Sequence, residues 1–397
     1  MVVDLGGTYY FVKVNCITTS TTFISTLVHL HICTKKPILV IFPITGGTVD
    51  VSVHEKQLDG TLKELHRPDG GPWGGTRVDS NYIAWLTTVF GEKAVEKFKK
   101  EAMGDYVDLL RDFENKKRNI SSDTEGLITL RFPGALREFY EDLGEEDLTA
   151  KLARMNLKND VKILREKLRV SAHIVRKWFK ESTDKTVRHI TGILSEPTMK
   201  DVNTILLVGG FGECQLVQDT VKKAVGKRTV IVPEEAGLAV LKGAVRFGHQ
   251  PRSVSSRCVK YTYGFAKKIP FEENKHPLEK RIIDSYGDVM VKDVFAKVVE
   301  IGTTVDIGKD IRFPKEISMT IGNDVLVEIY TSTESDPKYT TDPSCTKVGV
   351  LNLGKAPGQK DEENLVHISF AFGGTELKVS VEILKTGKII TKTLDCL

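Results

Sequence analysis

Two short glycine-rich stretches near the start of the chain have the composition of phosphate-binding turns. The first reads Asp4-Leu-Gly-Gly and the second reads Gly46-Gly47-Thr48-Val-Asp50, and each lies at the edge of an apolar run typical of a β-strand. Glycines let backbone N–H groups approach phosphate oxygens, and a nearby carboxylate can hold Mg²⁺ or its water. The two stretches therefore favour phosphate chemistry at one or both turns.

The relation between these stretches leaves two interpretations open. In one, the first stretch is a phosphate loop of its own, a strand followed by Asp-x-Gly-x-Thr. In the other, residues 8–45 and one glycine are an insert, and their removal joins the two halves into Asp-Leu-Gly-Gly-Gly-Thr-Val-Asp. Both ends of this insert can be encoded with splice-site bases inside glycine codons. We favour the second interpretation, in which residues 8–45 are translated intron that splits one phosphate loop.

A third glycine turn follows an apolar strand in the middle of the chain. The stretch "VNTILLVGGFGE" places Gly209, Gly210 and Phe211 between a predicted strand and a helix from about Gln215 to Val225. The strand "RTVIVP" and a further helix follow, and this alternation is typical of an α/β domain with a parallel sheet. Because a helix N-terminus favours an anion, this turn is a second candidate phosphate site.

A charged triplet adds a candidate binding surface. Glu114, Lys117 and Arg118 stand at i, i+3 and i+4, so a helix would place them on one face. Taken alone, the triplet is best explained as an ion-pair patch within the helix.

The elements that would position these residues can also be predicted. Residues 46–65 alternate apolar and polar side chains around Asp59-Gly60, which predicts a β-hairpin. A glycine-rich loop then leads to a helix capped near Asp79, and two or three helices extend through Arg118. A long amphipathic helix is predicted over residues 170–195.

The chain changes character after about residue 250. Short strand-like runs separated by Gly, Asp and Pro replace the helical patterns, which predicts a β-sandwich. We therefore expect a domain boundary near residue 250.

The overall composition narrows the partners and the compartment. The 57 basic and 53 acidic residues leave a net charge of +4, too even to favour nucleic acid as a partner. The apolar runs are too short to span a membrane, for which about 20 residues are needed. The six cysteines form no C-x-x-C pair and no zinc-type cluster, which indicates a reducing compartment. We expect a cytoplasmic protein.

The motifs together resemble the seventy-kilodalton heat-shock chaperone family, whose ATPase fold is shared with actin and the sugar kinases. The stretches "DLGG", "GGTVDVSV", Glu114-x-x-Lys117-Arg118, "ILLVGGFGE" and "PEEAGLAVLKGAV" occur in the order of that family. The stretch "LKELHRPDGGPWGGTRVD" is similar to its divergent heat shock 70 kDa protein 12 branch, and the tail resembles its peptide-binding β-sandwich.

The resemblance implies a particular domain organisation. It gives an α/β, actin-like ATPase domain, second lobe only, over residues 46–250, followed by an all-β sandwich over residues 255–397. Residues 1–45 would hold a partial phosphate-loop strand and the insert.

The resemblance also implies a site for ATP or ADP with Mg²⁺, in which Asp4 would hold the metal through a water. It assigns no catalytic residue. The residues that it assigns are Asp4, Gly6, Gly47, Thr48 and Asp50 in the phosphate loop, Glu114, Lys117, Arg118 and Ser121 at the ribose and adenine, Gly209, Gly210 and Phe211 in the adenosine pocket, and Glu234 near the purine edge.

Several departures from the family change what we expect of this chain. Glu213 stands where many members place an arginine against the adenine, and the first nucleotide-binding lobe and the helical lid do not match any part of the sequence. An insert between Gly7 and Gly46 would also separate Asp4 from the rest of the loop. We therefore expect weak or absent nucleotide binding and essentially no hydrolysis.

The resulting prediction is a chaperone-like protein whose full-length parent binds unfolded or extended peptides and co-chaperones under nucleotide control. Two alternatives stay open. One is a catalytically inactive actin-fold module that binds partners through its β-sandwich. The other is a sugar or acetate kinase, against which the β-rich tail argues.

Overall fold

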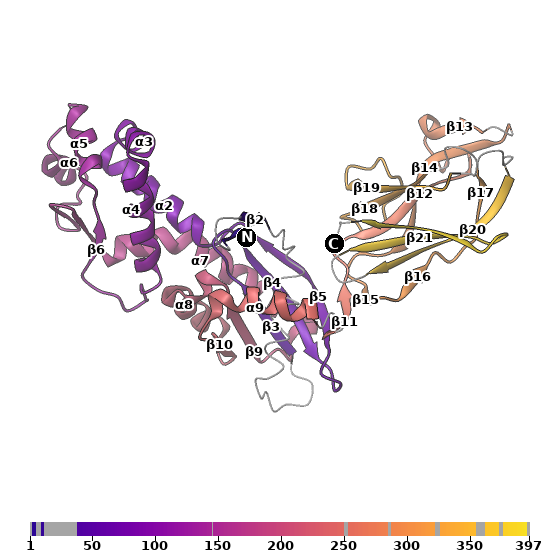
Figure 1. Cartoon of the computed structure of the whole chain (residues 1–397), viewed down its shortest axis with the longest axis horizontal. Coiled ribbons are helices and arrows are strands. Elements are labelled where there is room, and N and C mark those ends of the chain that lie inside the picture. The colour runs from indigo at the N-terminus through magenta and orange to yellow at the C-terminus, as the bar shows by residue number, and fades with distance from the viewer. Residues whose placement is uncertain are drawn as a thin grey trace. The chain divides into compact units, whose positions relative to one another are not determined.

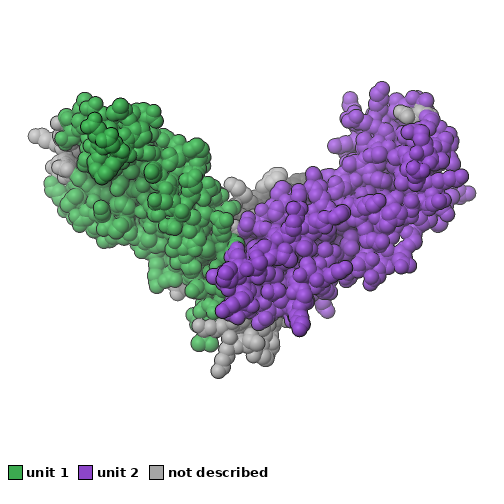
Figure 2. Space-filling model, turned by 180° about the vertical axis from the view of Figure 1, so that it is seen from behind, with its two compact units in different colours: residues 1–21, 53–68, 247–397 green, residues 22–52, 69–246 purple. Residues whose placement is uncertain are grey.

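The computed structural model describes residues 2–4, 9–11, 38–144, 146–249, 253–284, 287–321, 326–354, 362–372 and 376–394. The chain divides into two compact units, coloured green and purple in Figure 2. The first unit consists of residues 1–21, 53–68 and 247–397, and the second unit of residues 22–52 and 69–246.

Parallel strands form the centre of the second unit. Strand β3 (Ile38–Pro43) lies between β9 (Thr204–Val208) and β4 (Val49–Lys56), and β10 (Thr229–Ile231) continues the sheet beyond β9. The pairs β3–β9 and β9–β10 are both parallel. Nearly every residue of β3 and β9 is buried, as is typical of parallel strands covered on both faces. The predicted parallel α/β arrangement is confirmed.

Helices surround these strands and extend into a helical region with a small sheet of its own (Figure 1). The predicted helix capped near Asp79 in fact begins four residues earlier, because the glycine-rich loop itself turns into the helix. The helices are α2 (Gly75–Phe90), α3 (Glu92–Glu101), α4 (Met103–Lys117), α5 (Gly134–Asp142), α6 (Leu148–Arg154), α7 (Ala172–Leu194), α8 (Gln215–Val225) and α9 (Ala236–His249).

The small sheet has the order β6–β8–β7 and is antiparallel. Its strands are β6 (Leu127–Arg131), β7 (Val161–Leu164) and β8 (Lys167–Ser171). The hairpin of β7 and β8 was not predicted, because its strands are short and its turn lacks the residues that usually mark a hairpin. Nearby, the rings of Tyr82, Phe113 and Trp178 pack together with centroids 4.3 to 5.7 Å apart.

Two antiparallel sheets make up most of the first unit. One has the order β13–β14–β12–β18–β19, and the other has the order β16–β20–β21–β22 with β17 also paired to β20. The strands are β12 (Thr262–Pro270), β13 (Arg281–Ile283), β14 (Val289–Val299), β16 (Asp310–Arg312), β17 (Ile317–Ile321), β18 (Leu326–Ser332), β19 (Cys345–Asn352), β20 (Glu362–Phe372), β21 (Leu377–Ile383) and β22 (Lys388–Leu394).

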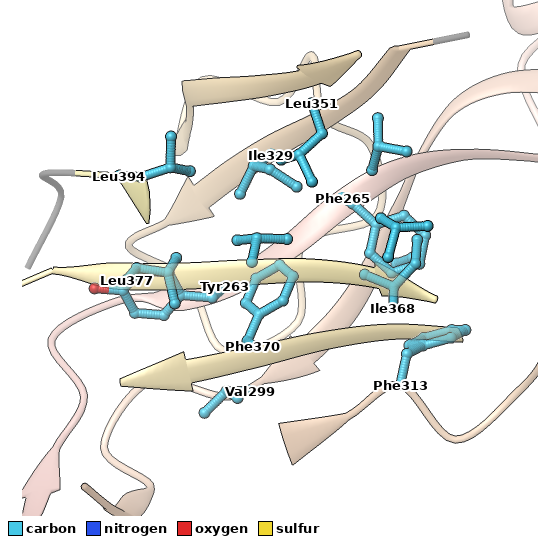
Figure 3. Packing of buried hydrophobic residues seen from close by; sticks show 14 of the residues in the cluster. Tyr263, Phe265, Val299, Phe313, Ile329, Leu351, Ile368, Phe370, Leu377 and Leu394 are labelled. Carbon is cyan, nitrogen blue, oxygen red and sulfur yellow. The ribbon is translucent and has the colours of Figure 1, made fainter. Parts of the chain in front are cut away.

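Side chains from both sheets meet in one hydrophobic core. Figure 3 shows Tyr263 and Phe265 of β12 and Ile329 of β18 close to Phe370 of β20 and Leu377 of β21. The alternation of buried and exposed residues along β21 is the pattern expected when one face of a strand packs on a core.

The first unit also contains shorter strands. Strands β1 (Val2–Asp4) and β2 (Tyr9–Phe11) form a two-stranded sheet. The predicted hairpin around Asp59-Gly60 is confirmed: Gly60 has φ 84° between β4 and β5 (Leu62–Gly71). Strand β11 (Val254–Cys258) pairs in parallel with β5 and antiparallel with β15 (Thr304–Asp306).

Three ionisable side chains are buried where β4, β5 and β11 meet in the first unit. His54, Glu64 and Arg257 are 1%, 3% and 4% exposed. The Glu64 carboxylate accepts a hydrogen bond from the Cys258 N–H at 3.1 Å. Within the described residues, the guanidinium nitrogens of Arg257 and the ring nitrogens of His54 have no hydrogen-bond partner. This cluster therefore places an acid and a base of opposite charge, Glu64 and Arg257, in the interior with few hydrogen bonds.

The predicted division of the chain into 1–45, 46–250 and 255–397 stays a prediction. One boundary between the units follows Arg246, but residues 53–68 belong with the C-terminal part. The described end of the predicted insert contains β3, which is central in its sheet order. Most of the predicted insert lies outside the described residues.

Candidate nucleotide site

Strand β3 ends in a tight turn that carries two of the predicted phosphate-binding residues. The Thr45 Oγ1 atom accepts a hydrogen bond from the Thr48 N–H at 3.1 Å, and the Thr48 hydroxyl donates to the Asp50 carboxylate at 2.9 Å. Gly46 and Gly47 between them are exposed. The two threonine side chains therefore close the turn and leave its glycines open to solvent.

A second glycine turn, just before α2, packs directly on the first. The Gly75 N–H donates to the Thr45 carbonyl at 3.1 Å, and the Thr76 N–H donates to the Gly46 carbonyl at 2.6 Å. A Cβ atom on Gly74 would lie 2.4 Å from the Thr45 carbonyl oxygen. Position 74 must therefore be glycine for the two turns to approach this closely.

The third glycine turn, after β9, packs on the same segment at Ile44. Gly209 has φ 86°, and a Cβ atom there would lie 2.5 Å from the Ile44 carbonyl oxygen. That carbonyl accepts hydrogen bonds from Phe211 N–H at 3.0 Å and Gly212 N–H at 3.2 Å. The turns at Gly46-Gly47, Gly74-Gly75 and Gly209-Gly210 thus meet at the end of β3. We call this place the glycine-turn junction.

Lys117 of α4 lies beside the glycine-turn junction and is only 3% exposed. Its Nζ atom is 2.7 Å from Asp79 Oδ1 and also pairs with the Glu114 carboxylate. The same atom is 6.0 Å from the centroid of the Phe211 ring. Burial raises the pKa of Asp79 even though Lys117 acts in the opposite direction. Lys117 is therefore a buried cation neutralised by two carboxylates.

Arg118 links two parts of the second unit at the rim. Its Nη2 and Nη1 atoms lie 3.2 Å from Glu114 Oε1 and 3.2 Å from Glu213 Oε2. The other Glu213 oxygen accepts a hydrogen bond from the Gly237 N–H of α9 at 2.7 Å. The acid at position 213 thus holds α4, α9 and the third glycine turn together.

Fewer contacts define the positions of the remaining predicted residues. The Ser121 hydroxyl is 3.0 Å from the Thr124 hydroxyl, and Glu234 is exposed in the segment before α9. Gly6 and the side chain of Asp4 lie outside the described residues. Strand β1, which ends at Asp4, belongs to a different sheet from β3, and β3 itself contains no carboxylate.

Sequence analysis missed two contributors to this site, Asp79 and the Gly74-Gly75 turn. The glycine run "GGPWGGTRVD" was a usable signal, because glycines at such density indicate close backbone approach. Nothing in the sequence specified which turn it approaches. Within the described residues, no group of three or more His, Cys, Asp and Glu side chains is arranged to hold a metal ion.

The fold and the site define a class: a mixed α/β protein whose glycine turns gather at the ends of parallel strands, where ligands bind in such folds. The family model described as Hsp70 protein matches residues 27–249. This match covers more than half of the chain, so the chain belongs to the Hsp70 family.

Curated relatives agree with this assignment. The chain is 31% identical over 374 residues to Heat shock 70 kDa protein 12B of Homo sapiens, covering 90% of this chain and 54% of that protein. It is 30% identical over 370 residues to Heat shock 70 kDa protein 12A of Mus musculus, with the same coverage of 90% and 54%. It is 26% identical over 218 residues to Chaperone protein DnaK of Mycoplasmopsis synoviae (strain 53), covering 53% and 32%.

These matches support the predicted resemblance to the divergent 12A and 12B branch. The chain spans about half the length of the curated relatives it matches most extensively. None of the helices in the described part of the chain combines the length and apolar character that crossing a bilayer requires.

Proposed function

We propose that the second unit binds ATP or ADP at the glycine-turn junction. The observation that carries this proposal is the meeting of three glycine turns at the end of β3, beside a cluster of fixed charges. Exposed glycine turns present backbone N–H groups to phosphate oxygens. Members of the Hsp70 family generally bind nucleotide with Mg²⁺, which supports this use of the site.

Each part of the site has a role in this proposal. Gly47 and Thr48 would contact phosphate, and Arg118 would lie against the nucleoside. Asp50 is the carboxylate that the turn itself supplies, and it would hold Mg²⁺ through a water. The metal would neutralise phosphate charge when bound. We expect weak affinity, because Glu213 places an acid and not a stacking cation at the rim.

The test compares two arginines of the same region by titration calorimetry with Mg·ADP. Arg118 contacts Glu213 at the junction, whereas Arg111 of α4 pairs with Asp108 at the surface. We expect Arg118→Ala to weaken binding at least tenfold and Arg111→Ala to leave it unchanged. Equal affinities in both variants, or no binding by the unaltered chain at millimolar nucleotide, would overturn the proposal.

The first unit supplies a second part of the proposed function. We propose that its two packed sheets act as a β-sandwich that takes extended peptide by strand addition. This proposal is supported by the typical binding of peptide substrates in the Hsp70 family. Peptide affinity would respond to nucleotide in the full-length parent, which we expect in the cytoplasm with co-chaperones. In this chain, fluorescence anisotropy of an extended apolar peptide with and without Mg·ADP measures both binding and coupling.

One observation favours a second candidate, an interaction module without nucleotide chemistry. The charged side chains of the site are already paired within the protein. Lys117 pairs with Asp79, and Arg118 pairs with Glu114 and Glu213. Glu213 also accepts a hydrogen bond from the Gly237 N–H. A site closed by its own ion pairs gains little from nucleotide. Peptide binding that persists unchanged with Mg·ADP, in a chain that binds no nucleotide, is the result that this alternative predicts.

A further inference from the structure

A strongly basic cavity lies in the second unit, formed by residues other than those of the glycine-turn junction. It has a volume of about 740 Å³ and is lined by the hairpin of β7 and β8 together with α5. Four cations and one carboxylate take part in the lining, which is made of Arg137, Ile163, Leu164, Arg165, Glu166, Lys167 and Arg169.

The cations of the hairpin lack counter-ions. The side chains of Arg165, Lys167 and Arg169 make no ion pair or hydrogen bond with any other part of the chain that the structure describes. Other surface arginines of the same region are paired: Arg131 is 3.4 Å from Asp105, and Arg154 pairs with Glu146. The three cations of the hairpin are therefore available to an anionic ligand.

The strand register brings like charges together around this cavity. Arg169 of β8 stands opposite Lys162 of β7, and Lys167 of β8 stands opposite Arg131 of β6. Like charges directly opposite one another destabilise a sheet. An anion bound over these strands would relieve that repulsion.

The two-residue turn of this hairpin holds a cation at a positive φ. Arg165 has φ 50°. Among the described residues other than glycine, positive φ also occurs at Asn156, Asn274 and Asp293, whose side-chain types tolerate it. Arginine is less suited to positive φ than these residue types, and backbone strain of this kind is concentrated at functional sites. Glycine would relieve the strain but would remove the charge.

Contacts on both sides hold this turn in place. The Arg137 guanidinium donates to the Arg165 carbonyl at 2.9 Å and lies 5.4 Å from the Phe132 ring centroid. The Phe132 N–H donates to the Glu166 carbonyl at 2.9 Å. The cavity wall is thus fixed before any ligand arrives.

We propose that this cavity binds a small molecule that carries clustered phosphate groups. Guanidinium groups bind phosphate through paired, charge-assisted hydrogen bonds, and a cavity of this volume suits a small ligand. Each phosphate brings up to two charges and three acceptor oxygens in a small space.

Two phosphate sources share this chemistry, and the experiment separates them. Titration calorimetry on the full chain uses inositol hexakisphosphate as a phosphorylated ring and tripolyphosphate as a free oligophosphate. Because either probe could also meet the phosphate-binding turns of the glycine-turn junction, the comparison of variants below assigns the binding to the cavity or to the junction. Tighter binding of one probe identifies the source, and binding of either at the cavity supports the proposal.

The variant Arg165→Gln/Lys167→Gln/Arg169→Gln removes three charges from the cavity. The matched control Lys93→Gln/Lys100→Gln/Lys158→Gln removes three exposed charges elsewhere in the second unit. We expect the cavity variant to weaken binding at least thirtyfold and the control by less than threefold. Affinity should also fall steeply between 50 mM and 200 mM salt.

The single variant Arg165→Gly distinguishes binding lost with the charge from binding lost through misfolding. Because glycine accepts positive φ, this variant should unfold at the same or a higher temperature while binding the better probe at least fivefold more weakly. Three results would overturn the proposal: no binding of either probe, equal losses in the cavity and control variants, or equally tight binding of citrate, a clustered carboxylate.

Discussion

Buried ionisable groups in the first unit respond to pH in opposite directions. Burial raises the pKa of Glu64 to about 7, although Arg257 opposes the shift. Burial, together with Arg257, lowers the pKa of His54 to about 3. Glu64 therefore contributes stability at low pH that is lost as the pH rises from 4.5 towards 7. His54 contributes stability above pH 6.5 that is lost as the pH falls towards 3.

Removing His54 should expose the effect of Glu64. Between pH 4.5 and 6.5 the two slopes oppose each other in the unaltered chain. In His54→Gln, we expect stability to fall with rising pH by about 1.4 kcal/mol per unit, the value for one proton. Hydrogen exchange of the β11 amides measures this stability. The double variant His54→Gln/Glu64→Gln should be flat over the same range, and a flat profile in His54→Gln itself would contradict the assignment.

The buried Lys117 should matter far more for stability than its neighbour in the sequence. Lys117→Ala leaves two carboxylates facing each other, so we expect a loss of about 2 kcal/mol, below the value for a fully buried pair because the acids are part-exposed. Lys116→Ala breaks only the exposed pair with Asp112 and should cost about 0.5 kcal/mol. Urea unfolding followed by tryptophan fluorescence compares them, and equal losses would refute the buried-pair account.

At the scale of elements, the glycine-turn junction depends on how closely β3, α2 and β9 approach one another. The end of β3 supplies the carbonyl oxygens at Ile44, Thr45 and Gly46, and the other two turns donate to them. These backbone bonds fix the spacing of the three turns. The geometry of the site therefore depends on backbone contacts between these elements as much as on any side chain.

Two glycine-to-alanine variants test this dependence. At Gly209, a methyl group meets both a positive φ and the Ile44 carbonyl, so we expect a loss of about 3 kcal/mol. At Gly192 in α7, a methyl group meets nothing within 4 Å, and alanine should stabilise the helix by about 0.5 to 1 kcal/mol. Urea unfolding measures both. A Gly209→Ala variant as stable as the unaltered chain would show that the turns are not tightly packed.

Local patterns predicted most elements but not how they meet. The hairpin at Asp59-Gly60, the parallel strands and the long helix α7 each follow from short-range signals in the sequence. The hairpin of β7 and β8 was missed because its strands are only four and five residues long and its turn, Arg165-Glu166, contains no glycine, asparagine or proline. The glycine turns were recognised singly. Their meeting, and the bridge from Glu213 to Gly237, arise from contacts between distant segments that no local pattern encodes.

At the scale of the whole molecule, the two units have separate hydrophobic cores, and only the second unit contains tryptophan. The three tryptophans, Trp73, Trp85 and Trp178, all belong to the second unit. The cluster of buried apolar side chains around Phe370 belongs to the first unit. Tryptophan fluorescence therefore reports the unfolding of only one of the two cores.

A core substitution in the first unit should leave that fluorescence signal in place. Phe370→Ala removes a fully buried ring and should destabilise the first unit by about 3 to 5 kcal/mol, whereas Ile389→Ala, at a residue 61% exposed, should change little. We expect hydrogen exchange in β20 and β21 to accelerate in Phe370→Ala while the tryptophan transition stays unchanged. A matching shift in the tryptophan transition would show instead that the two units unfold together.

Nucleotide binding at the glycine-turn junction is the central claim, and hydrogen–deuterium exchange with and without saturating Mg·ADP tests it most directly. We predict slower exchange in three separated segments at once: residues 44–49, 72–78 and 208–214. Helix α3, which contributes no residue to the glycine-turn junction or to the basic cavity, serves as an internal reference that should not change. Exchange that is unaltered in these three segments, or slowed only elsewhere in the chain, would contradict the account.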